Sequence, residues 1–204
     1  MRIQKHIIFI AIILLLVQSC DMFSTRTPEL PDTGRSSFQP PFAPEIVIAN
    51  FTNAVKEKNV DNFTACFSDT SKNFSASYRF IPSTEALGKF GTMFIGWNIE
   101  SERKAFSSLM SNMDSDVFPI LILSNSEQYS FEIKQQDSAV FESDYHLTVN
   151  HSRQTIEPIF AGTLRFLIKP GTDGTWSIEQ WTDMNPSNDS VSVTWSSLKA
   201  GFIN

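Results

Sequence analysis

Two carboxylates and an imidazole alternate along one segment of the chain, in the order Glu142-x-Asp144-x-His146. Alternate residues of a β-strand project from the same face, so these side chains would lie next to one another. Such a group could ligate a metal ion or supply a general acid and a general base. The residues of opposite parity are apolar and must face a core: Phe141, Tyr145, Leu147 and Val149. We therefore expect a solvated charged face, paired with Arg165 on the next strand, rather than a metal site.

Other catalytic patterns are missing from the sequence. Beyond His6, which lies at the start of the chain in the expected signal, a catalytic triad would need His146 or His151, and no serine lies in a nucleophile-elbow motif. Gly88, Gly91 and Gly96 lack the Lys-Ser/Thr ending of a phosphate-binding loop. We expect neither a cofactor nor a catalytic set of residues.

Aromatic side chains are the other candidates for a binding site. Seven of them could line an apolar pocket: Tyr78, Phe80, Phe94, Trp97, Tyr145, Phe166 and Trp176. The chain contains 18 phenylalanines, so the alternative is that these rings simply fill the core.

The beginning of the chain has the pattern of a secretory signal. Arg2 and Lys5 precede an unbroken apolar run over residues 7–17, which Gln18-Ser19-Cys20 follows. The run is too short to span a bilayer, which needs about 20 apolar residues.

The stretch Leu16-Val17-Gln18-Ser19-Cys20 resembles the lipobox of bacterial lipoproteins, with Gln18 as a departure from the usual pattern. The resemblance implies that residues 1–19 are removed and that Cys20 is lipidated, anchoring the chain to a membrane of the bacterial cell envelope. Asp21 resembles a signal for retention in the inner membrane. The alternative is an ordinary cleaved signal followed by an incidental cysteine.

Residues 20–43 are rich in proline, serine and threonine and lack hydrophobic periodicity, which predicts a flexible tether. Cleavage would remove Arg2 and Lys5 from the 16 basic residues but none of the 22 acidic ones, leaving a net charge of −8. Such an acidic chain argues against nucleic-acid binding, which depends on neutralising phosphates.

Helical spacing of apolar residues begins at Pro44, a residue suited to a first helical turn. After a break, Asp61 is expected to cap a short second helix that carries Cys66 as a small buried side chain. A third helix is expected over residues 99–113, with Asn98 as its cap.

The period of the apolar pattern then changes to two. Residues 117–123 are apolar on both faces, which predicts a well-buried strand, and Gly171-Thr-Asp-Gly174 predicts a hairpin turn. Further strand-like segments lie around residues 74–81, 129–134, 141–149, 160–169 and 176–179. This order predicts an α+β fold with N-terminal helices packed on a curved antiparallel sheet.

This order of elements, closed by Trp176-Ser-Ile-Glu-Gln-Trp-Thr-Asp183, resembles the nuclear-transport-factor-2-like (NTF2-like) superfamily. The resemblance implies a cone-shaped domain over residues 44–190, with a pocket between helices and sheet. Residues 191–204 are expected to pack as a C-terminal appendage beyond that core.

Steroid-isomerising members of the superfamily pair a pocket tyrosine with two acidic residues. Tyr78 or Tyr145 could supply the tyrosine, but we expect no acid on the apolar parity of the strands, which counts against such catalysis. The preferred hypothesis is a non-enzymatic envelope lipoprotein that binds an envelope protein, an apolar small ligand or a second copy of itself through the sheet. The alternative is an isomerase, dehydratase or hydrolase-like enzyme that uses a pocket in the cone.

Overall fold

The computed structural model describes residues 36–126, 129–186 and 193–203. The expected signal, Cys20, Asp21 and most of the expected tether lie outside these residues. Within them, none of the helices combines the length and the apolar character needed to cross a membrane.

Three helices of the described chain correspond to those expected from the sequence: α2 (Pro44–Lys56), α3 (Val60–Ala65) and α5 (Ile99–Ser111). Asn98 caps α5 as expected, because its side chain accepts hydrogen bonds from the backbone N–H groups of Glu100 and Ser101. The cap of α3 is Asn59 rather than Asp61. Helix α3 therefore begins earlier than the sequence pattern indicated.

The segment between α3 and α5 differs most from the expectation. The strand expected over residues 74–81 is confined to β1 (Arg79–Ile81), and the short helices α4 (Thr84–Phe90) and η2 (Gly91–Phe94) follow it. Ser83 caps α4 by accepting a hydrogen bond from the Ala86 backbone N–H. Ala86 is the only buried residue of α4, so this helix has almost no apolar periodicity to reveal it.

The remaining strands are β2 (Ile120–Leu123), β3 (Phe131–Lys134), β4 (Ala139–Thr148), β5 (Ile159–Pro170) and β6 (Trp176–Met184). The sheet has the order β1-β6-β5-β4-β2, and β3 also pairs with β4. Neighbouring strands are antiparallel except β1 and β6, which run parallel, so the sheet is mixed. The α+β class is confirmed, as is the hairpin turn between β5 and β6, where Gly174 has a φ of 80°.

Strand β2 is not buried on both faces, contrary to expectation. Leu121 and Leu123 are buried, but Ile120 and Ile122 are 56% and 58% exposed. The reason is that the helices cover only one face of the sheet, so the side chains of β2 on the other face are left exposed.

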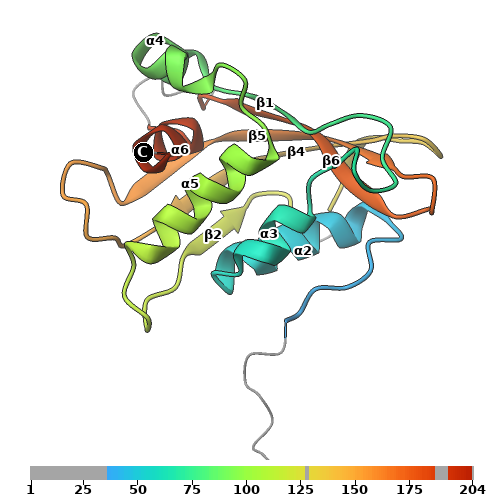
Figure 1. Ribbon diagram of the computed structural model, residues 1–204, viewed down its shortest axis with the longest axis horizontal. Helices are drawn as coiled ribbons and strands as arrows, with labels where there is room; N and C mark the ends of the chain where they lie inside the picture. Colours follow the sequence, from blue (N-terminus) through green and yellow to red (C-terminus); the bar gives the residue numbers. More distant parts are fainter. Residues whose placement is uncertain (1–35, 127–128, 187–192, 204) are drawn as a thin grey trace, which may run out of the picture. The chain divides into compact units, whose positions relative to one another are not determined.

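The C-terminal helix α6 (Trp195–Phe202) belongs to the core of the domain. It lies beside α5, on the face of the sheet that α2 and α3 also cover (Figure 1). Trp195, Leu198 and Phe202 are at most 2% exposed, and the Trp195 ring lies 4.9 Å from that of Trp181, between ring centroids. The segment expected as an appendage thus contributes its helix to the interior instead.

Candidate functional site

The alternating set Glu142, Asp144 and His146 lies on the outer face of β4. Asp144 and His146 are exposed, and Glu142 forms an ion pair with Arg165 at 3.2 Å. Among the residues that the structure describes, no group of three or more histidine, cysteine or carboxylate side chains could hold a metal ion. The structure therefore places this set on the solvated charged face that its parity indicated.

The aromatic candidates pack mainly against one another. All except Trp176, which is half-buried, are buried: Tyr78, Phe80, Phe94, Trp97, Tyr145 and Phe166. The Trp181 ring lies 5.5 Å from that of Phe80 and 5.3 Å from that of Phe166, between centroids, with near-perpendicular planes. Such edge-to-face packing fills space, so these rings form a core rather than the wall of an open pocket.

The most unusual chemistry of the domain lies where α5 meets α6. Glu102 is 1% exposed, and its Oε1 atom accepts three hydrogen bonds. The donors are the Tyr78 hydroxyl at 2.6 Å, Trp97 Nε1 at 2.8 Å and Lys199 Nζ at 2.6 Å. A buried carboxylate requires such partners, because its transfer from water is otherwise very costly.

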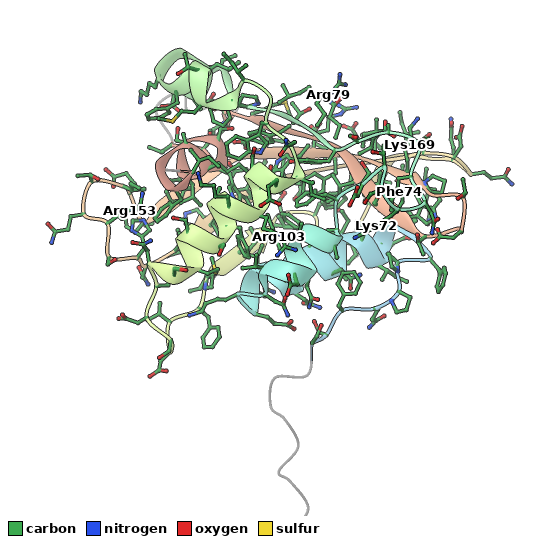
Figure 2. The ribbon with its side chains drawn as sticks, in the orientation of Figure 1. Lys72, Phe74, Arg79, Arg103, Arg153 and Lys169 are labelled. Atoms are coloured by element: carbon green, nitrogen blue, oxygen red, sulfur yellow. The ribbon has the colours of Figure 1, made fainter. Side chains whose placement is uncertain are left out.

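Lys199 is itself 4% exposed, which is rare for a lysine. Basic side chains such as Lys72 and Arg79 are exposed (Figure 2), whereas Lys199 Nζ lies 3.4 Å from the ring centroids of both Phe80 and Trp181. Burial lowers the pKa of Lys199 to about 8, against the opposing attraction of Glu102, so the ammonium still carries its charge at neutral pH. We call the surrounding residues Tyr78, Phe80, Trp97, Glu102 and Trp181 the ammonium cage.

A second buried carboxylate caps the start of α6. Asp183 Oδ2 accepts from the Ser196 backbone N–H at 2.6 Å and from its hydroxyl at 2.5 Å, and Oδ1 accepts from the Tyr145 hydroxyl at 2.8 Å. The Tyr145 oxygen in turn accepts from the Trp195 backbone N–H at 2.6 Å. Residues of β4 and β6 thus satisfy the unpaired N–H groups of α6, whose N-cap residue Thr194 makes no side-chain cap.

Gly162 makes room for this cap. It lies opposite Tyr145 in the pairing of β4 with β5. A Cβ atom on Gly162 would lie 2.7 Å from the Tyr145 hydroxyl and 2.6 Å from the carbonyl oxygen of Met184. A side chain there would displace the tyrosine that contacts the N-terminus of α6.

The expectation that no acid lies on the apolar parity of the strands is wrong. Asp183 follows the fully buried Trp181 by two residues on β6, so both project to the same face. The sequence analysis also overlooked Glu102, although its position in the apolar pattern could have revealed it. Glu102 lies between Ile99 and Phe106 at helical spacing, and a charged residue on an apolar helix face indicates a buried partner.

The interior next to the ammonium cage holds almost no free space. The cavity bounded by α3, α5 and α6 offers about 10 Å³ to the centre of a water molecule. That is room for one water at most. Its lining includes Glu102, Trp195, Leu198, Lys199 and Phe202, so α6 occupies the space between the helices and the sheet.

Comparison with known proteins finds a similar fold among solved structures. No family model and no curated protein matches the chain. An NTF2-like superfamily protein from Salmonella enterica serovar Typhimurium LT2 is 14% identical, with a TM-score of 0.51 over 71% of this chain and 89% of that one. The chain has the NTF2-like fold. A ketosteroid isomerase-like protein from Erwinia carotovora atroseptica is 11% identical, with a TM-score of 0.45 over 70% and 93% of the two chains.

Removing the Asp183 carboxylate is expected to loosen α6 from the NTF2-like core. Asp183→Ala leaves three buried donors without their acceptor, and each such donor costs about 1–3 kcal/mol. We expect a loss of about 3 kcal/mol or more in the free energy of unfolding, measured by urea denaturation. Asp137→Ala, at an exposed aspartate, is the matched control and should change the stability by less than about 0.5 kcal/mol. Equal stability of the two variants would contradict the capping role.

Proposed function

We propose that this chain is a lipid-anchored protein of the bacterial cell envelope whose NTF2-like domain is a non-enzymatic interaction module. The observation that carries the proposal is the filling of the interior by α6. Pockets for small molecules typically have volumes of about 300–1,000 Å³, whereas the cavity between α3, α5 and α6 offers about 10 Å³. A separate hollow of about 430 Å³, lined by α4, α6 and the segment before β5, includes neither Glu102 nor Asp183. A domain whose interior is filled in this way is suited to contacts through its outer surface.

The hydrogen bonds of both buried carboxylates to other groups of the domain support the same proposal. Glu102 Oε1 accepts three hydrogen bonds and the two oxygens of Asp183 accept three more from groups of the chain, and burial raises the pKa of Asp183. A general acid or base must reach a substrate proton within about 3 Å. The cavity that Glu102 lines has room for one water at most, and Asp183 lines none of the pockets described above.

The alternative is an isomerase, dehydratase or hydrolase-like enzyme, and one observation favours it. Tyr145 and Asp183 form a buried hydroxyl–carboxylate pair, and burial raises the pKa of Tyr145 well above its usual value. This pair could act on a substrate only after α6 had left the interior, because Trp195 and Ser196 bind directly to it.

The outer face of the sheet is the surface that we propose for contacts with a second copy. Ile120 on β2, Thr148 on β4 and Ile159 on β5 are paired in one row across the strands. Ile122, His146 and Ala161 form the next row, and the three isoleucines are each more than half exposed. A twofold contact between two such faces would bury this apolar patch without any further partner.

Introducing lysines on the outer face of the sheet is expected to abolish self-association. The full-length protein in mild detergent should sediment as a dimer, and the Ile122→Lys/Ile159→Lys variant as a monomer. Lysine would have to be buried without a counter-ion in the contact. Ile95→Lys, at an 81% exposed residue outside the sheet, is the control and should remain dimeric. A monomeric wild-type protein, or a dimeric double variant, would refute the contact.

Lipid attachment at Cys20 is expected to decide where the protein is found. In bacterial cells grown with radiolabelled palmitate, the wild-type chain should carry the label and sediment with membranes. Cys20→Ala removes the thiol that the acyl group needs, so its product should carry no label, whereas Cys66→Ala should label normally. An unlabelled wild-type chain would disprove the anchor and leave the interaction role to be tested by sedimentation.

A further inference from the structure

We propose that the ammonium cage is a binding site for a primary ammonium group, and that Lys199 of α6 occupies it as an internal ligand. The cage supplies each element that recognition of such a group requires. Glu102 provides the counter-charge, two aromatic faces lie against the nitrogen, and the rest of the enclosure excludes water. It requires neither the lipid anchor nor self-association.

Each contact with the Lys199 nitrogen is specific to a cation. The 2.6 Å hydrogen bond to Glu102 is charge-assisted. The rings of Phe80 and Trp181 present their faces to Nζ at 3.4 Å, and Trp97 adds a third ring at 5.9 Å. Cation–π attraction of this kind is strongest where the cation has lost its water.

The composition of the cage does not follow from packing alone. A buried ion pair is often no more stabilising than apolar side chains of the same volume, so methionine and leucine could fill this space at lower desolvation cost. The walls around Lys199 nevertheless include a carboxylate, Glu102. The Tyr78 hydroxyl and the Trp97 indole N–H both donate hydrogen bonds to its Oε1 atom. Tyr78 and Trp97 fix the carboxylate of Glu102 so that it does not depend on Lys199 for its position.

The cage is built from parts of the chain that precede α6. Tyr78 lies just before β1, Phe80 lies on β1, Trp97 precedes α5, Glu102 lies on α5 and Trp181 lies on β6. Only the occupant comes from α6. An external amine would therefore compete with the Lys199 side chain for a site whose walls the rest of the domain supplies.

The test empties the cage without removing α6. Lys199→Ala deletes three methylene groups and the ammonium, which are the heavy atoms of n-propylammonium. We expect n-propylammonium to stabilise the full-length variant against thermal unfolding and to bind about tenfold more tightly than 1-propanol, its neutral counterpart. Binding is measured by calorimetry and stabilisation by circular dichroism.

Two controls separate the cage from general amine effects. Lys199→Met fills the same space with an apolar chain, and the wild-type cage is already occupied, so n-propylammonium should stabilise neither protein. Equal stabilisation of all three proteins, or equal affinity of the alanine variant for 1-propanol, would overturn the proposal.

The test also covers an alanine variant that fails to fold alone. Refolding of Lys199→Ala would then be followed with and without n-propylammonium. Recovery of native circular dichroism with the amine, and not with 1-propanol, supports the cage. No recovery with either compound, or equal recovery with both, would overturn it. Neither outcome bears on membrane labelling or on sedimentation of the wild-type protein, so the two proposals fail separately.

Discussion

Ending the chain before Val193 is expected to unfold the domain. The truncation removes Trp195, Leu198 and Phe202, whose side chains are at most 2% exposed. Deleting one buried aromatic or leucine side chain typically costs about 2–5 kcal/mol, so the combined loss is on the order of 10 kcal/mol. That is comparable with the whole stability of a typical domain, which is about 5–15 kcal/mol.

The measurement is thermal and urea unfolding of the full-length protein beside the truncated one, followed by near-ultraviolet circular dichroism. The truncated chain should lack a cooperative transition, since its apolar interior would be open to water. Leu198→Ala is an intermediate case and should retain a transition at lower stability, by about 2–5 kcal/mol. A truncated protein with a transition near that of the full chain would mean that α6 is an appendage after all.

Replacing Glu102 and replacing Lys199, the two partners of one ion pair, are expected to lower the free energy of unfolding by unequal amounts. Glu102→Ala leaves the Lys199 ammonium buried without a counter-ion, together with the donors of Tyr78 and Trp97, and should cost about 3–5 kcal/mol. Lys199→Met leaves Glu102 with two of its three donors and replaces the cation by an apolar chain of similar length. Its loss should be smaller, about 1.5–3 kcal/mol, which is typical of one hydrogen bond to a charged group.

The double variant Glu102→Ala/Lys199→Met closes a mutant cycle. Without the uncompensated ammonium, its stability should exceed that of Glu102→Ala alone, with a coupling of about 1–3 kcal/mol. Arg103 and Asp61 form an exposed ion pair, and Asp61→Ala should cost less than about 1 kcal/mol. Additive losses at Glu102 and Lys199 would show that their ion pair contributes nothing.

The pH dependence of the free energy of unfolding provides a second test of this ion pair. The pKa of Lys199 is lowered to about 8 in the folded chain, so between about pH 8 and 10.5 the unfolded chain binds more protons at this residue. The contribution of Lys199 to stability must therefore rise with pH over that interval. Wild type should therefore gain stability relative to Lys199→Met between pH 7.5 and pH 9.5. A constant difference would contradict it.

The α+β class and its main elements could be read from the sequence because they depend on local patterns. Alternating apolar residues define β4, β5 and β6, and the spacing of Ile99, Phe106 and Leu109 defines α5, with Asn98 as its cap. The solvated face of Glu142, Asp144 and His146 follows from parity in the same way. The lipobox at Cys20 is also a local motif, although it lies outside the described residues.

Only the tertiary structure decided what fills the interior. Residues 191–204 carry apolar side chains, but their sequence does not indicate whether α6 packs outside the core or within it. Glu102, Asp183 and Lys199 lie 16 or more positions apart, so their partnership depends on the folded path of the chain. A buried charge is stable only when distant elements bring its partner into contact, and that contact is a property of packing rather than of any local pattern.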